Sequence, residues 1–292
     1  MTTPARQFPD RPDAAGFVRA ALAAALAQVQ SHMDAVDAGS SEAERIHQLR
    51  VALRRLRTLL RECAGLAPGM RAEWDAPLAL AFARLGTLRD AGTLADVVRP
   101  LLQDADAPLC EWTVPDAGQA DADAAAAVRE PQFLQTLAEI HALAQAPAGK
   151  RQPGLVSLSA AGTRKYLARR LARLHRQVLR DGRHFDRLPL AQQHRVRKRL
   201  KRLRYLADFA REFAPGMWPG KRVGASPRRW CPPRTRWACT TTWPWRPRFR
   251  DEAGTDPRAW FAAGYLQARL ATSARSSRRA LRALARVPGF WA

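Results

Sequence analysis

Residues 47–57 read His47-Gln48-Leu49-Arg50-Val51-Ala52-Leu53-Arg54-Arg55-Leu56-Arg57, and 147 positions later residues 194–204 read His194-Arg195-Val196-Arg197-Lys198-Arg199-Leu200-Lys201-Arg202-Leu203-Arg204. The two copies share the pattern H-x-x-R-x-x-x-[RK]-R-L-R. Its histidine and cations recur at i, i+3, i+7 and i+10, which is the spacing of one α-helix face. Each copy therefore predicts a helix that carries a row of cations headed by an imidazole.

A row of like charges destabilises an isolated helix, so such a face either stays fully solvated or meets a polyanion that neutralises it. A solvated face is the common case for a single row, but two rows with matched spacing favour a polyanion. Arginine suits this role because its guanidinium binds phosphate oxygens through two parallel hydrogen bonds.

The rest of the sequence predicts an all-α fold. Hydrophobic residues make up 47% of the chain and recur at helical spacings, and no series alternates as a strand would. We expect one helix around the first basic row and others over residues 14–37, 71–88, 91–103, 132–145, 156–181, 189–213 and 257–286. Residues 104–130 are rich in Asp, Ala, Pro and Gly and indicate a connector between two related halves.

The net charge of +23 is unevenly distributed along the chain. Residues 1–130 hold 14 Arg, no Lys and 18 Asp or Glu, a net charge of −4, whereas residues 131–292 hold 35 basic and 8 acidic residues, a net charge of +27. The basic second half points to an anionic partner, which can be nucleic acid, an anionic membrane surface or a phosphate polymer.

The four cysteines show no metal-ligand spacing such as C-x2-C, so neither structural disulfides nor zinc are expected. The N-terminus lacks the apolar core of a signal peptide, and no stretch of about 18 apolar residues exists. We therefore predict a cytoplasmic protein without a membrane span, a metal site or a cofactor.

Together these features resemble the CHAD family, the conserved histidine α-helical domain, over roughly residues 12–291. The family's signatures stand here as His47-Gln48-Leu49-Arg50-Val51 with Arg54-Arg55-Leu56-Arg57, as Leu85-Gly86-Thr87-Leu88-Arg89-Asp90, as Arg197-Lys198-Arg199-Leu200-Lys201-Arg202-Leu203-Arg204-Tyr205, and as the terminal Phe290-Trp291. The resemblance implies two pseudo-symmetric four-helix bundles with a basic cavity between them that binds inorganic polyphosphate. The expected first bundle is about 12–104, the connector 105–130 and the second bundle 131–291.

The resemblance and the two rows predict the polyphosphate-binding residues. They are His47, Arg50, Arg54, Arg55, Arg57, His194, Arg197, Lys201, Arg202 and Arg204, with Lys165, Arg169 and Arg173 as further candidates from a third basic helix. The two histidines could instead be hydrogen-bonded core residues, but equivalent positions at the heads of both rows favour ligand contact, with affinity rising as pH falls. Asp90 is expected to orient an arginine.

We expect binding without catalysis. Many family members carry an additional triphosphate-tunnel domain with the signature E-x-E-x-K, and the nearest string here, Glu42-Ala43-Glu44-Arg45-Ile46, lacks the lysine. A phosphohydrolase is disfavoured because clustered carboxylates for Mg²⁺ and a Walker-type loop are both missing. A nucleic-acid-binding protein is the alternative, although no base-reading module is recognisable, so polyphosphate and polyphosphate granules are the expected partners.

Residues 221–250 differ from everything around them. They hold nine Lys or Arg, four Trp, five Pro and no acid, Leu or Ile. Reading Trp230 to Arg246 in a shifted frame yields a possible L-G-x-x-x-D motif, so we hypothesise that two compensating frameshifts have replaced a bundle helix over about residues 223–249. The five prolines forbid one continuous helix there.

Overall fold

The fold is all-helical over the residues that the computed structural model describes, which are 10–38, 43–67, 69–93, 103, 117–146, 158–218 and 257–291. Its helices are α1 (Ala14–Asp37), α2 (Ala43–Cys63), α3 (Asp75–Thr93), α5 (Ala117–Arg129), α6 (Pro131–Gln145), α7 (Ala160–Asp181), α8 (Leu190–Phe213) and α12 (Pro257–Ala285). Short 3-10 turns, η1 (Ala72–Trp74), η3 (Phe185–Arg187) and η4 (Pro215–Met217), lie between them. None of the described helices is long and apolar enough to cross a membrane.

Local sequence signals explain several helix starts. The Asp13 carboxylate accepts a hydrogen bond from the Gly16 N–H at 2.7 Å and caps α1, and the Ser159 hydroxyl accepts one from the Gly162 N–H at 3.3 Å and caps α7. Pro131 opens α6, at a position where its missing N–H costs nothing. These signals are local, so they are readable from sequence alone.

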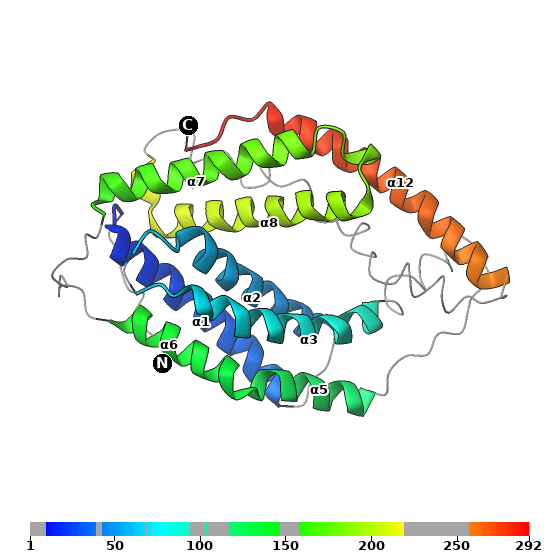
Figure 1. The fold of residues 1–292 in the computed structure, drawn as a ribbon, viewed down its shortest axis with the longest axis horizontal. Coiled ribbons are helices and arrows are strands. Elements are labelled where there is room, and N and C mark those ends of the chain that lie inside the picture. Colours follow the sequence, from blue (N-terminus) through cyan, green and yellow to red (C-terminus); the bar gives the residue numbers. More distant parts are fainter. Residues whose placement is uncertain are drawn as a thin grey trace.

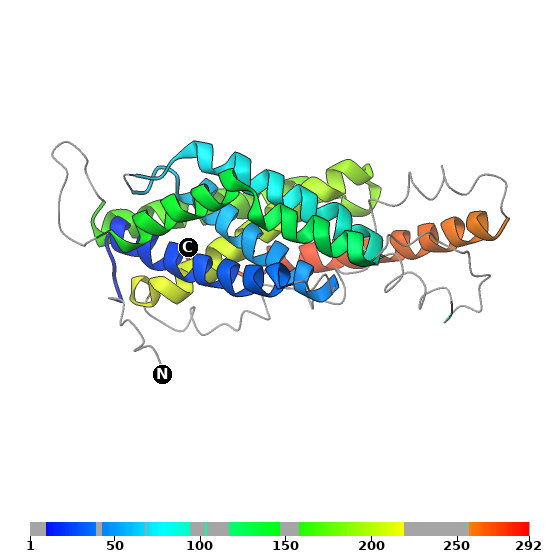
Figure 2. The same cartoon turned by 90° about the horizontal axis from the view of Figure 1, so that it is seen from below.

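The helices fall into two groups (Figure 1). In the first group α1 packs on α2, α5 and α6, and α3 packs on α2, α5 and α6; in the second, α7 packs on α8 and α12. The groups meet where α8 contacts α1 and α2, and one core runs through both, with Phe17, Leu53 and Phe209 fully buried. Figure 2 shows that α12 extends beyond the other helices at one end of the molecule.

Helices α5 and α6 lie around the expected boundary between the two halves. Helix α5 occupies the second half of the expected connector, because its small residues Ala124 and Ala127 pack closely in the core. Helix α6, expected in the second bundle, lies instead in the first group, where the Trp74 Nε1–H donates to Glu139 at 2.8 Å. The full two-bundle architecture stays a prediction.

Helix α3 is also longer than expected. It continues through residues 89 and 90, where the sequence suggested a break, and Gly86 lies inside it as expected. Gly86 lies next to the guanidinium of Arg50, a member of the first basic row. The frameshift hypothesis for residues 223–249 falls outside the described residues.

The terminal Phe290-Trp291 pair is part of the core. Both side chains are buried, Phe290 lies edge-on to Trp218 with ring centroids 5.2 Å apart, and Trp291 lies edge-on to His175 at 5.9 Å. This contact anchors the chain end against α7 and the end of α8.

Candidate functional site

The two basic rows lie on α2 and α8, as the repeat predicted. Residues at equivalent positions of the two copies are buried to a similar extent. Arg50 and Arg197 occupy the same place in the two copies, and each is only 8% exposed, although arginine is rarely buried. Leu56 and Leu203, which are also equivalent, are both buried in the core. The shared spacing therefore reflects a shared helix orientation.

Arg50 lies flat against α3. Its Nη1 donates a hydrogen bond to the Phe82 carbonyl at 2.6 Å, and its guanidinium lies 4.2 Å from the centre of the Phe82 ring. A Cβ atom added to Gly86 would come within 2.3 Å of this Nη1, closer than real Cβ contacts occur. Gly86 therefore leaves the space that the Arg50 guanidinium occupies against α3.

Arg57 continues the same face and is held by an acid. Its Nε and Nη2 donate to the Asp75 carboxylate at 2.8 and 3.2 Å, and Arg61, one turn further on, donates to the same carboxylate at 3.0 Å. The hydrogen bond from Arg57 is the main reason that the pKa of Asp75 lies below its ordinary value. Asp75 thus stays ionised and fixes this end of the row.

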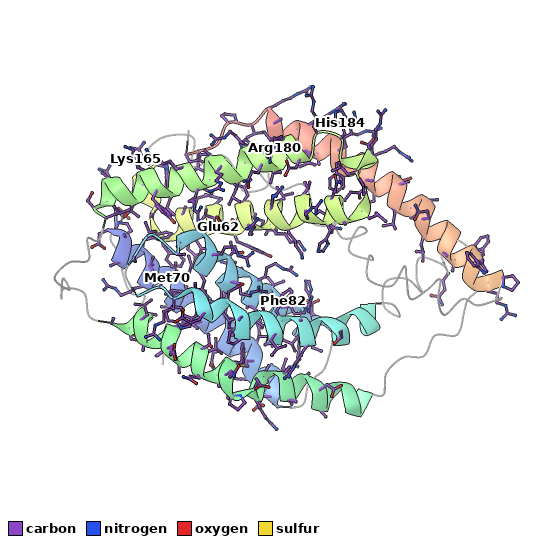
Figure 3. All side chains as sticks on the ribbon, viewed as in Figure 1. Glu62, Met70, Phe82, Lys165, Arg180 and His184 are labelled. Carbon is purple, nitrogen blue, oxygen red and sulfur yellow. The ribbon has the colours of Figure 1, made fainter. Side chains whose placement is uncertain are left out.

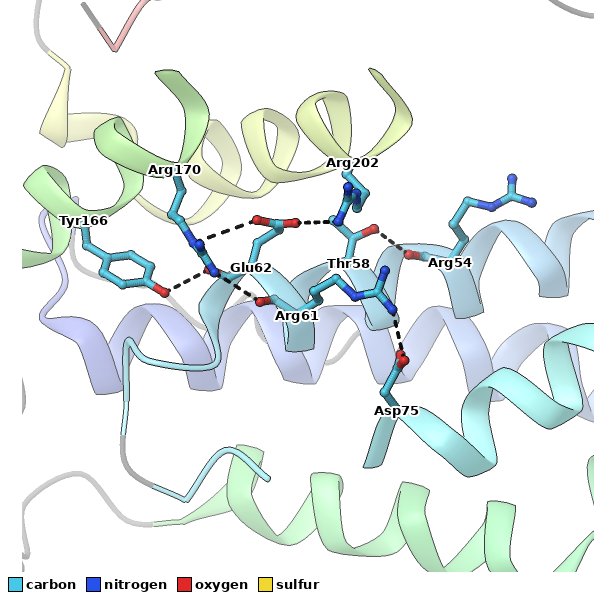
Figure 4. A network of polar contacts seen from close by, with 8 residues as sticks. All are labelled: Arg54, Thr58, Arg61, Glu62, Asp75, Tyr166, Arg170 and Arg202. Atoms are coloured by element: carbon cyan, nitrogen blue, oxygen red, sulfur yellow. Dashed lines mark hydrogen bonds and ion pairs between the residues drawn. The ribbon is translucent and has the colours of Figure 1, made fainter. Parts of the chain in front are cut away.

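Arg54 differs from its neighbours in the row. Its guanidinium lies 4.9 Å from the centre of the Phe82 ring, and in the described part of the chain no carboxylate forms an ion pair with it. Figure 4 shows its side chain extending away from the polar network around Glu62. Arg54 therefore presents a charge that no acid on the described helices neutralises.

The positive charge of Arg54 acts on Arg197 of the second row. Burial, and then the positive charge of Arg54, lower the pKa of Arg197 to about 10. Two guanidinium groups from the two repeats are therefore close enough to repel each other across the contact between α2 and α8. Such an arrangement raises the free energy of the ligand-free protein and is relieved by a bound anion.

His194 lies in the same positive field. Loss of hydration, followed by the charges of Lys198, Arg197, Lys201 and Arg54, lowers its pKa to about 4. We call Arg54, His194, Arg197, Lys198 and Lys201 the cation cluster. Lys198 was not among the residues expected from the sequence, because it is not repeated in the first row.

Besides Arg57, three predicted residues have acidic partners. Arg55 lies 3.8 Å from Glu212, Arg202 lies 3.3 Å from Glu62, and Arg204 lies 3.6 Å from Asp208 one turn along α8. These arginines help to join α2 to α8 or to stabilise α8 itself. His47 is half-buried near the start of α2.

Glu62 forms the centre of a polar network at the end of α2 (Figure 4). Its buried carboxylate lies 3.3 Å from Arg202 of α8 and 3.8 Å from Arg170 of α7. The Tyr166 hydroxyl and the Arg170 Nε donate to the Glu62 backbone carbonyl at 3.0 and 3.2 Å, which satisfies one of the last carbonyls of α2. The network fixes α2 against α7 and α8.

The three candidates from the third basic helix lie elsewhere. Lys165, Arg169 and Arg173 are exposed on α7, whose buried face is formed by Thr163, Leu167, Leu171, Leu174 and Val178. Figure 3 shows Lys165 at the outer side of α7, far along the molecule from Phe82. No described contact joins these three cations to the cation cluster, so their role in binding stays a prediction.

Sequence reasoning missed the residues that organise the rows. Phe82, Asp75 and Glu62 come from positions outside the repeat, and only the glycine of Leu85-Gly86 gave a signal, since a glycine within an apolar helix often marks a close approach. The side chain of Asp90 lies outside the described ones. In the described part of the chain, no group of three or more His, Cys, Asp or Glu side chains has a metal-binding arrangement.

Comparison with known proteins identifies the class of helical protein that carries these two basic rows. The family model described as CHAD domain matches residues 20–230. The chain belongs to the CHAD-domain family. Curated protein sequences give no match to it.

A solved structure has the same fold. The crystal structure of the CHAD domain from the plant Ricinus communis superposes with a TM-score of 0.70 at 22% sequence identity, covering 99% of this chain and 98% of that chain. The likeness extends over nearly the whole length of both chains, and at this identity it concerns the fold.

Proposed function

We propose that the chain binds inorganic polyphosphate, without catalysis, through the cation cluster on α2 and α8. One observation carries the proposal: α2 and α8, which hold the two copies of the repeat, pack against each other, and the charge of Arg54 on α2 lowers the pKa of Arg197 on α8. Family membership supports a phosphate polymer as the anion. Such a ligand releases its counterions when cations replace them, so affinity should fall steeply with salt.

The ordering of the neighbouring arginines supports a phosphate ligand. Arg50 and Arg57 are fixed by the Phe82 carbonyl and by Asp75, so the row loses little side-chain freedom when a ligand binds. Each charge-assisted contact between arginine and phosphate is worth about 1.5 to 3 kcal/mol. A flexible single chain can follow cations on two packed helices, whereas a duplex is stiff over about 150 base pairs.

A competition experiment tests polyphosphate against the nucleic-acid alternative. The protein is first bound to a fluorescent DNA duplex, and unlabelled polyphosphate is then added at equal phosphate concentration. We expect polyphosphate to displace most of the duplex at physiological salt. Retention of the duplex would favour a nucleic-acid-binding function instead.

The position of His194 predicts how binding depends on pH. With its pKa near 4 in the ligand-free protein, His194 is neutral at neutral pH. A bound polyanion offsets the charges of Arg54, Arg197, Lys198 and Lys201 and raises that pKa, so binding takes up a proton. Affinity should therefore increase as pH falls from neutrality towards about 4, below the range ordinary for histidine.

The measurement is a titration with polyphosphate between pH 4.5 and 7.5. His194→Gln should show a flatter pH dependence than the wild type. His141→Gln, which removes an exposed histidine on α6, is the matched control and should follow the wild type. Identical profiles for all three proteins would show that His194 takes no part in binding.

A further inference from the structure

Phe82 lies at the centre of the first basic row. The guanidinium groups of Arg50, Arg54 and Arg57 lie 4.2, 4.9 and 5.7 Å from the centre of its ring. All three distances are within the range of about 6 Å over which the negative face of an aromatic ring attracts a cation. The ring offsets part of the repulsion among the three guanidinium groups.

The three arginines differ in what else holds them. Arg50 donates to the Phe82 carbonyl, and Arg57 donates twice to Asp75. The Arg54 guanidinium lies over the ring of Phe82, and its charge acts on Arg197. The orientation of the Arg54 guanidinium therefore depends on the ring more than that of either neighbour.

We propose that Phe82 is a positioning residue, whose ring holds the Arg54 guanidinium in the orientation that binds the anion. The inference rests on the proposed function and goes beyond it by assigning a role to a residue with no charge and no place in the repeat. The ring offsets part of the repulsion from Arg50, Arg57 and Arg197, and it reduces the number of rotamers that Arg54 occupies before the ligand arrives. Gly86 belongs to the same arrangement, because it lets Arg50 and α3 approach closely enough to place the ring.

A double-mutant cycle tests the proposal with polyphosphate as the probe. Phe82→Leu keeps a large apolar side chain but removes the aromatic face, and we expect it to weaken binding by about three- to tenfold. Phe82→Tyr keeps the face and should bind within about twofold of the wild type. In the background of Arg54→Ala, Phe82→Leu should lose most of its effect, because the group that the ring orients is gone.

The controls separate positioning from folding. Tyr265→Leu removes a second aromatic ring that lies under an arginine, 5.3 Å from Arg269 on α12, and should leave binding unchanged. Thermal unfolding of each variant shows whether a loss of affinity follows a loss of stability, which a purely structural role would predict.

Three results would overturn the proposal: wild-type affinity in Phe82→Leu, an equal loss in Phe82→Tyr, or an undiminished effect of Phe82→Leu in the Arg54→Ala background. The proposed function fails in a different way, because Arg54→Ala alone would then bind polyphosphate as well as the wild type. A side-chain NMR spectrum of the ligand-free protein gives a second readout. The Arg54 Nε–H signal should lose dispersion in Phe82→Leu and keep it in Phe82→Tyr.

Discussion

Replacing Arg54, Arg197 and Lys201 together by glutamine is expected to lower the affinity for polyphosphate by at least about 100-fold. The reason is that each lost charge-assisted contact costs about 1.5 to 3 kcal/mol, and these three cations come from both copies of the repeat. Circular dichroism should show unchanged helix content, since glutamine is a good helix former and the substitution relieves the repulsion between Arg54 and Arg197. Isothermal titration calorimetry measures the affinity.

A matched control has the same change in net charge. Arg176, Arg183 and Arg279 are exposed on the second group of helices, and replacing all three by glutamine should reduce affinity only slightly. Equal losses in the two triple variants would mean that polyphosphate responds to overall charge and that the cation cluster is an ordinary solvated surface.

The second large effect concerns stability. Glu62→Ala should lower the free energy of unfolding by about 2 to 3 kcal/mol, because it removes the carboxylate that lies between Arg170 and Arg202. The Glu62 side chain is 7% exposed and the two arginines 29% and 25%, so water compensates their lost partner only in part. Urea denaturation followed by circular dichroism measures the change.

Glu212→Ala is the control for this prediction. Glu212 also pairs with an arginine across α2 and α8, at 3.8 Å from Arg55, but its side chain is 53% exposed. Exposed pairs contribute about 0 to 1 kcal/mol, so this variant should unfold nearly as the wild type does. If Glu62→Ala were as stable as Glu212→Ala, the network at the end of α2 would not fix the helices as described.

The sequence could predict the helix positions of residues that recur with the same spacing. It could not predict the partners of residues that act through tertiary contacts. The spacing of Arg50 and Arg197 placed both on equivalent helix faces, and their equal burial agrees with it. The sequence could not show that Arg55 and Arg202 meet acids while Arg54 does not, because Glu212 and Glu62 lie far from their partners along the chain. The spacing of charged residues identifies candidate binding residues, and the packing of the helices determines which of these residues lie close together.

The helix boundaries also divide into those that local sequence predicts and those that depend on tertiary contacts. The apolar periodicity placed α1 at its observed bounds and α7 within four residues of them, because both helices bury one face. Gly86 was expected inside a helix, but the sequence could not show that its missing side chain accommodates Arg50 from another helix. The Asp- and Ala-rich stretch before residue 130 read as a connector, although its alanines pack into the core as α5.

The salt dependence of polyphosphate binding tests the central claim most directly. The slope of log K against log salt reports the number of cations that replace counterions, at about 0.7 per contact for a single-stranded polyanion. We predict that the slope becomes shallower by about 2 when Arg54, Arg197 and Lys201 are replaced by glutamine, and that it is unchanged in the variant of Arg176, Arg183 and Arg279. An equal slope in both variants would contradict binding at the cation cluster.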